Sequence, residues 1–183
     1  MFKNSLFYLL LIVRLISCDN NYRSGMVVSA KHEASKAGID ILKRGGNAFD
    51  AMIATDLALA VVYPNAGNLG GGGFMVYRLS DGKNGTLDYR EKAPINSKVD
   101  MYLDDNNQVI KGLSQNGALA IGVPGTIAGL FEIHDKFGSI PIKELFQPAI
   151  DLANNGYKLT SNQVNTINNY KDLILKLNDS IDL

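Results

Sequence analysis

The chain has 183 residues, 46% of them hydrophobic, which suits one modest domain with a single core better than two. Its 18 basic and 18 acidic side chains balance without a basic stripe, which excludes an electrostatically driven nucleic-acid-binding protein. One Cys excludes an intrachain disulfide framework, and two His residues leave too few ligands for a zinc site. We therefore expect no metal and no cofactor.

The first 18 residues have the pattern of an export signal. Lys3 precedes an apolar run at 6–13 that is too short to cross a bilayer but suits a signal peptide. Residues 15–18 then resemble a bacterial lipobox, which predicts lipidation of Cys18 and a periplasmic or membrane-anchored lipoprotein. Arg14 interrupts the apolar stretch, so a plain cleaved signal and a short buried helix remain alternatives. The polar residues 19–25 are expected to be a tether.

A strand and a helix are predicted next. The small apolar run 26–30 suits a buried strand, and apolar residues recur at helical spacing across 31–44. Gly45 and Gly46 are expected to end that helix.

The following helix is predicted to be an interior one. Asn47 is a natural N-cap, and Asp50 lies close to the positive end of the helix dipole. Residues 51–62 are apolar on nearly every side, and Pro64 ends the pattern soon after them.

A glycine run at 70–73 precedes a predicted β-hairpin. A phosphate-binding loop needs Lys and a hydroxyl residue after its last Gly, but Phe74 follows here. We interpret the run as backbone that passes close to another backbone or to a substrate. Strands are predicted at 74–79 and 86–90, joined by strong turn residues.

Beyond residue 94 the pattern predicts a polar loop and then helices, giving a mixed α/β (α+β) domain. Residues 100–117 are expected to be a solvated loop or a short hairpin. Helices are predicted at 125–136, 141–156 and 161–177. Pro124 is expected to open the first of them. Pro148 is expected either to bend the second or to confine it to later residues.

The segment 88–94, at the end of the second strand, is the clearest candidate for chemistry. Its Arg90 has a planar fork that can hold a carboxylate through two parallel hydrogen bonds, and Glu91 could orient it. From these residues alone, we favour the alternative, a surface Arg paired with a neighbouring carboxylate.

Four segments in the same order resemble the γ-glutamyltransferase family. They are residues 45–51, 70–74, 88–94 and 122–129. Shorter similarities follow at 136–138 and 148–156, so the resemblance covers nearly everything from residue 26 to about 159.

The resemblance implies an N-terminal nucleophile hydrolase with a four-layer αββα sandwich, made as a precursor that cleaves itself into two subunits. A Thr freed by that cleavage would attack a γ-glutamyl donor such as glutathione and pass the γ-glutamyl group to water or an amino acid. Arg90 matches the Arg with which the family holds the α-carboxylate of the donor.

The catalytic nucleophile expected from the family is missing from this sequence. It is a Thr followed closely by a second small hydroxyl residue and His, and none of the five Thr residues has that context. We therefore expect residues 26–183 to be an incomplete large subunit that needs the rest of that subunit and the small subunit as partners, or a non-catalytic remnant or binding module.

Overall fold

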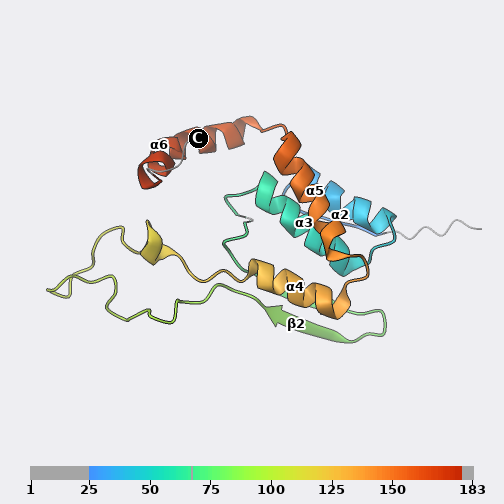
Figure 1. Cartoon of the computed structure of the whole chain (residues 1–183), viewed down its shortest axis with the longest axis horizontal. Helices are drawn as coiled ribbons and strands as arrows, with labels where there is room; N and C mark the ends of the chain where they lie inside the picture. Colours follow the sequence, from blue (N-terminus) through green and yellow to red (C-terminus); the bar gives the residue numbers. More distant parts are fainter. Residues whose placement is uncertain (1–24, 67, 179–183) are drawn as a thin grey trace, which may run out of the picture.

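The computed structural model describes residues 25–66 and 68–178 and shows a helical body with one β-hairpin (Figure 1). In chain order the elements are α2 (His32–Lys43), α3 (Ala48–Val62), β1 (Phe74–Arg78), β2 (Asn84–Asp88), the 3₁₀ turn η1 (Ala118–Ala120), α4 (Thr126–Phe137), α5 (Ile142–Asn155) and α6 (Ser161–Leu177). The mixed α/β (α+β) class is confirmed. The predicted signal and Cys18 lie outside the described residues.

Helix α3 is the centre of the body, as its all-round apolar surface predicts. It contacts α2, α4 and α5. Ile53, Ala54 and Ala58 are fully buried, and so is Val62 at its C-terminal end. A helix that is apolar on every side is stable only when other elements cover it, and three neighbouring helices do so here.

The N-terminus of α3 is fixed by a polar cluster. The side chain of Asn47 accepts hydrogen bonds from the backbone N–H groups of Phe49 and Asp50, at 2.8 and 3.1 Å. The carboxylate of Asp50 accepts from the backbone N–H of Asn47 at 2.9 Å, which completes a capping box. It also accepts from the backbone N–H and the hydroxyl of Ser139, at 3.0 and 2.5 Å. Asp50 therefore ties α3 to the connection between α4 and α5.

The β-hairpin packs one face on the helices. Strands β1 and β2 are antiparallel, with Met75 opposite Leu87. Met75 is buried, and the ring of Tyr77 lies 5.7 Å from that of Phe49 in α3 and 4.9 Å from that of Phe137 in α4. The rings of Tyr77, Phe49 and Phe137 therefore join the hairpin to α3 and α4. Helix α4 lies beside β2 in Figure 1.

Several details of the sequence-based assignment are wrong. The second strand runs over Asn84–Asp88 and not over 86–90. Residues 26–30 do not form a buried strand: the segment carries no strand assignment, and Met26 and Val28 are 86% and 83% exposed. A strand needs a neighbour for its backbone groups, and the one sheet in the described residues consists of β1 and β2. Pro124 does not open α4, because Gly125 is the N-cap. Helix α5 begins at Ile142 and runs through Pro148, so the proline does not confine it to later residues.

The long connection between β2 and α4 and the last helix lie at the edges of the body. The predicted polar loop contains a single bridge between Leu103 and Val109, and the hydroxyl of Tyr102 donates to the carbonyl of Leu119 at 2.9 Å. Helix α6 has the predicted bounds, but none of its residues is buried, and it extends away from the other helices (Figure 1). Its apolar stripe, which includes Ile167 and Tyr170, is exposed.

Candidate functional site

Arg90 lies two residues beyond the end of β2 and is fixed from several directions. Its backbone N–H donates to the Oδ1 atom of Asp88 at 3.0 Å, and its Nε atom donates to the Oε2 atom of Glu91 at 2.9 Å. The guanidinium carbon lies 5.6 Å from the centroid of the Phe74 ring, within cation–π range. The side chain of Arg90 is 59% exposed.

The ion pair with Glu91 uses only one edge of the guanidinium. Among the described residues, no carboxylate is paired with the two terminal nitrogens of Arg90. Those nitrogens form the fork that binds a carboxylate bidentately. The N–H group of its own backbone and the guanidinium of Arg90 lower the pKa of Glu91, with burial opposing them, so Glu91 stays ionised beside the arginine. The structure thus contains the neighbouring ion pair and also leaves the fork available.

Glycines on both sides allow the chain to pass tightly around Arg90. A Cβ atom on Gly72 would lie 2.5 Å from the carbonyl oxygen of Tyr89 and 2.7 Å from the backbone nitrogen of Glu91. A Cβ atom on Gly125 would lie 1.9 Å from the same carbonyl oxygen. No side chain fits at either position without a shift of the backbone. The interpretation of the glycine run as a close backbone approach is confirmed.

Backbone hydrogen bonds join the three segments that meet here. Gly73 and Tyr89 exchange N–H···O bonds of 3.3 and 3.0 Å, which extend the hairpin by one residue pair. The carbonyl of Gly71 accepts from the N–H groups of Gly125 and Thr126, at 2.8 and 3.1 Å. The glycine run therefore satisfies two N–H groups at the N-terminus of α4, which have no partner within the helix.

The ring of Tyr89 occupies a slot between two glycines. A Cβ atom on Gly73 would lie 2.8 Å from the ring, and one on Gly129 in α4 would lie 2.4 Å from it. Since Tyr89 immediately precedes Arg90, this packing fixes the position of the arginine backbone.

A pocket of about 360 Å³ adjoins Arg90 and is lined by the end of β2, residues 123–125 and the first turns of α4. Its charged lining residues are Asp88, Arg90, Lys92 and Glu132. Lys92 lies in the segment 88–94 singled out from the sequence, but no role was predicted for it. The signal that could have identified it is the alternation of side chains along an extended segment, which places residues 90 and 92 on the same face.

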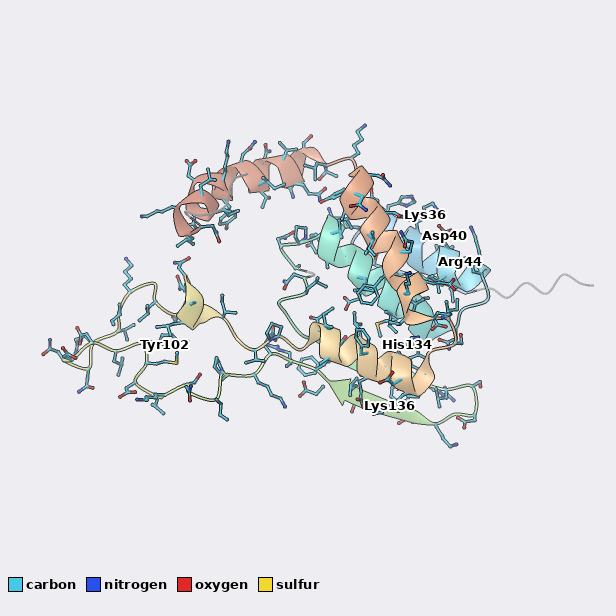
Figure 2. All side chains as sticks on the ribbon, viewed as in Figure 1. Lys36, Asp40, Arg44, Tyr102, His134 and Lys136 are labelled. Atoms are coloured by element: carbon cyan, nitrogen blue, oxygen red, sulfur yellow. The ribbon has the colours of Figure 1, made fainter. Side chains whose placement is uncertain are left out.

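The two histidines do not form a metal site with other residues. His32 is the exposed first residue of α2. His134 lies in α4 (Figure 2). Its Nε2 atom is 2.7 Å from the carbonyl oxygen of Ile140. Within residues 25–66 and 68–178, no group of three or more metal-binding side chains occurs. In the same residues, no helix has the length and apolar character needed to cross a membrane.

The five Thr residues lie within secondary structure or at its ends. Thr55 is buried in α3, where its hydroxyl donates to the carbonyl of Ala51 at 2.7 Å, and Thr160 caps α6. Thr86 lies in β2, Thr126 begins α4, and Thr166 lies in α6.

Comparison with known proteins identifies the chain's family. The family model described as gamma-glutamyltranspeptidase matches residues 34–182. The chain belongs to the γ-glutamyltranspeptidase family. The glutathione hydrolase proenzyme of Pseudomonas sp. (strain A14) is 51% identical over 144 residues, which are 79% of this chain and 25% of that protein. The glutathione hydrolase proenzyme of Escherichia coli (strain K12) is 42% identical over 153 residues, 84% of this chain and 26% of that protein.

The fold agrees with this assignment. The crystal structure of the Helicobacter pylori γ-glutamyltranspeptidase superimposes with a TM-score of 0.82 and 45% identity, covering 85% of this chain and 45% of that one. The chain therefore spans about a quarter of the length of its curated relatives, and its fold is an incomplete N-terminal nucleophile hydrolase fold.

The four segments that carry the resemblance have two structural roles in this chain. Residues 70–74, 88–94 and 122–129 converge on Arg90 through the glycine contacts and backbone hydrogen bonds. Residues 45–51 instead form the capped start of α3. Three of the four motifs thus build one site, and the fourth stabilises the helix at the centre of the body.

Proposed function

We propose that this chain contributes the donor-binding arginine of a γ-glutamyltransferase or glutathione hydrolase. In this role Arg90 holds the α-carboxylate of a γ-glutamyl donor such as glutathione. The observation that carries the proposal is the arrangement of the guanidinium at the 360 Å³ pocket, with Nε paired to Glu91 and the terminal nitrogens left for a ligand. Because the ion pair with Glu91 already orients the guanidinium of Arg90, the side chain loses less conformational freedom on binding a planar carboxylate than an unpaired arginine would.

The free fork of Arg90 favours an anionic group. Arg90 and Lys92 balance Asp88 and Glu132 in the pocket lining, and Glu132 already pairs with Lys136, as Glu91 does with Arg90. Asp88 accepts a hydrogen bond from the backbone N–H of Arg90. A carboxylate placed at the free fork of Arg90 gains charge-assisted hydrogen bonds that a neutral amide or ester in the same place lacks.

The reaction itself needs a nucleophile that this sequence does not contain. In the proposed complete enzyme, the hydroxyl oxygen of a Thr forms an ester with the γ-carbonyl carbon while the amide bond of the donor breaks and its nitrogen takes the proton. Water or an amine then opens the ester. The chain described here binds and orients the donor, and the remainder of the large subunit and the small subunit supply the Thr. A non-catalytic remnant or binding module is the alternative.

We further propose that the chain is exported and anchored by lipid on Cys18, as a periplasmic or membrane-anchored lipoprotein, with residues 19–25 as tether and 26–183 as the large-subunit portion. The apolar run at 6–13 and the lipobox-like residues before Cys18 support this. Expression in bacteria fed a labelled fatty acid tests it. Label on the unmodified chain and none on the Cys18→Ser variant is the expected result, and an unlabelled chain contradicts the proposal.

The catalytic assignment is tested by joining the chain to a complete relative. Residues 34–182 replace the aligned segment of the E. coli proenzyme, and release of aniline from a γ-glutamyl anilide is measured for the chimera and for the chain alone. We expect turnover by the chimera and none by the chain alone. Turnover by the rigorously purified chain alone would overturn the proposal that the rest of the enzyme supplies the nucleophile. A chimera that folds correctly and cleaves itself but is inactive would favour the non-catalytic alternative.

A further inference from the structure

Arg90 lies at the point where the chain changes its backbone partner. Tyr89 exchanges backbone hydrogen bonds with Gly73 and so still belongs to the ladder with β1. Lys92 instead exchanges hydrogen bonds of 3.2 and 2.8 Å with Val123, in an isolated antiparallel bridge. Arg90 therefore follows one pairing and precedes the other, and the contacts of its own backbone help to decide how its side chain is aimed.

The backbone of Gly125 approaches Arg90 but has partners of its own. A Cβ atom on Gly125 would lie 3.0 Å from the carbonyl oxygen of Arg90. The N–H group of Gly125 donates to the carbonyl of Gly71, and its carbonyl accepts from the N–H group of Gly129, each at 2.8 Å. Both groups of Gly125 are thus used at the start of α4, and the N–H group of Arg90 needs another acceptor.

The carboxylate of Asp88 supplies that acceptor. Its Oδ1 atom accepts a hydrogen bond of 3.0 Å from the backbone N–H of Arg90. The short side chains of Asp and Asn commonly reach the backbone N–H group two residues further along the chain in this way. Asp88 is the last residue of β2 and also lines the Arg90 pocket, the 360 Å³ pocket described above. Since donor and acceptor belong to nearly adjacent residues, the contact is complete without the rest of the enzyme.

We propose that Asp88 is a positioning residue for Arg90, whose carboxylate acts as a hydrogen-bond acceptor for the arginine backbone and not as a charge that contacts the donor. This role rests on the proposed function of Arg90. A negative charge in the pocket opposes an incoming carboxylate, whereas an acceptor turned toward the backbone of Arg90 keeps the guanidinium fork aimed at that carboxylate. An amide oxygen in the same place should therefore serve as well as the carboxylate oxygen.

Two substitutions separate the acceptor from the charge. Asp88→Asn keeps the short side-chain acceptor and removes the charge. Asp88→Glu keeps the charge, but its longer side chain does not form the same local turn. The matched control is Asp81→Glu, because the Oδ1 atom of Asp81 accepts from the backbone N–H of Lys83, also at 3.0 Å, in the turn between β1 and β2 and outside the Arg90 pocket. All three variants are made in the E. coli chimera, and kcat and KM are measured with a γ-glutamyl anilide.

We expect Asp88→Glu to raise KM about fivefold or more, whereas Asp88→Asn and Asp81→Glu should leave KM within about twofold of the parent chimera. In a chimera that also carries Arg90→Lys, Asp88→Glu should add less than about a twofold effect. A residue that acts only through the fork of Arg90 has little left to position once the fork is gone.

An Asp88→Asn chimera impaired as much as Asp88→Glu would mean that the charge itself contacts the donor, and it would overturn the proposal. An unchanged KM in Asp88→Glu, or the same loss with and without Arg90→Lys, would overturn it too. Arg90→Lys alone reports on the proposed function. No loss in that variant refutes the role of Arg90, whereas a loss there with no effect of Asp88→Glu refutes only the role of Asp88.

Amide hydrogen exchange in the unfused full chain provides a second measurement if the Asp88→Glu chimera fails to cleave itself. The N–H group of Arg90 should exchange faster in Asp88→Glu than in the parent chain and in Asp88→Asn, because only the Glu variant loses the acceptor. The N–H group of Lys83 should exchange at the same rate in all three chains. Equal exchange of the Arg90 N–H in the three chains would overturn the proposal.

Discussion

Replacing Gly125 by Ala tests the glycine contacts that position Arg90. The new Cβ atom would lie 1.9 Å from the carbonyl oxygen of Tyr89, 2.8 Å from its carbonyl carbon and 3.0 Å from the carbonyl oxygen of Arg90. All three contacts are with backbone atoms, so no side-chain rotation relieves them. The backbone angles of Gly125, φ −111° and ψ −18°, are accessible to Ala, so the effect is purely steric.

The size of the effect follows from the movement required. The two backbones must separate by about 1 Å to reach an acceptable contact, which costs about 1–3 kcal/mol by analogy with overpacked cores. The same movement weakens the hydrogen bond from the Gly125 N–H to Gly71, 2.8 Å long, which contributes about 1 kcal/mol. We expect a total loss of about 2–4 kcal/mol of unfolding free energy, or a decrease in Tm of roughly 5–15 °C.

The assay is urea unfolding followed by circular dichroism, with Gly71→Ala as the matched control. A Cβ atom on Gly71 meets only the side-chain oxygen of Asn68 at 3.4 Å and other atoms at 3.6 Å, so this variant should unfold close to the parent chain. If Gly125→Ala and Gly71→Ala have the same stability, the close approach of the two backbones does not exist and the account of the Arg90 site is wrong.

Two carboxylates on α3 should respond to substitution in opposite ways. Burial alone would raise the pKa of Asp50, but hydrogen bonds from Ser139, Asn47 and Ile140 outweigh it and lower that pKa below the usual 3.8. The ionised form of Asp50 therefore stabilises the fold fully above about pH 3.8, and this stabilisation is lost as the pH falls through the folded-state pKa. We expect Asp50→Asn to reduce the free energy of unfolding by about 1–3 kcal/mol at pH 7 and by less at pH 3. Burial raises the pKa of Asp56 above 3.8, so ionisation of this carboxyl opposes folding as the pH rises above that value. At pH 7, Asp56→Asn should therefore unfold at a higher urea concentration than the parent chain, and at pH 3 it should not. Urea titrations at the two pH values measure both effects, and a stabilising Asp50→Asn or a destabilising Asp56→Asn at pH 7 would contradict the assignments.

The sequence predicts those parts of the fold in which local chemistry and burial agree. Helix α3 follows from the Asn47 cap and an all-round apolar surface, and the hairpin follows from turn residues between two β-rich runs. Residues 26–30 have the composition of a strand, yet no described strand lies beside them to accept their backbone hydrogen bonds. Composition reports the preference of a segment, whereas a sheet also requires a neighbour that lies far away in sequence.

The candidate site is only partly visible in the sequence for the same reason. Arg90 and Glu91 are adjacent, and their ion pair can be anticipated from residue type alone. The convergence of Gly72 and Gly125 on the backbone of Tyr89 joins segments that are more than 15 residues apart, and no local pattern encodes it.

The assignment of Arg90 as the donor-binding residue is tested most directly by its substitution in the E. coli chimera. Steady-state release of aniline from a γ-glutamyl anilide is compared for the chimera, for Arg90→Lys and for the control Lys98→Ala, a residue that lies outside the Arg90 pocket. We predict that Arg90→Lys lowers kcat/KM about 10- to 100-fold, mainly through KM, because Lys cannot form two parallel hydrogen bonds with a carboxylate. A donor analogue without its α-carboxylate should be used equally poorly by the chimera and the Arg90→Lys variant. An unchanged kcat/KM in Arg90→Lys, with normal self-cleavage, would contradict the role of Arg90.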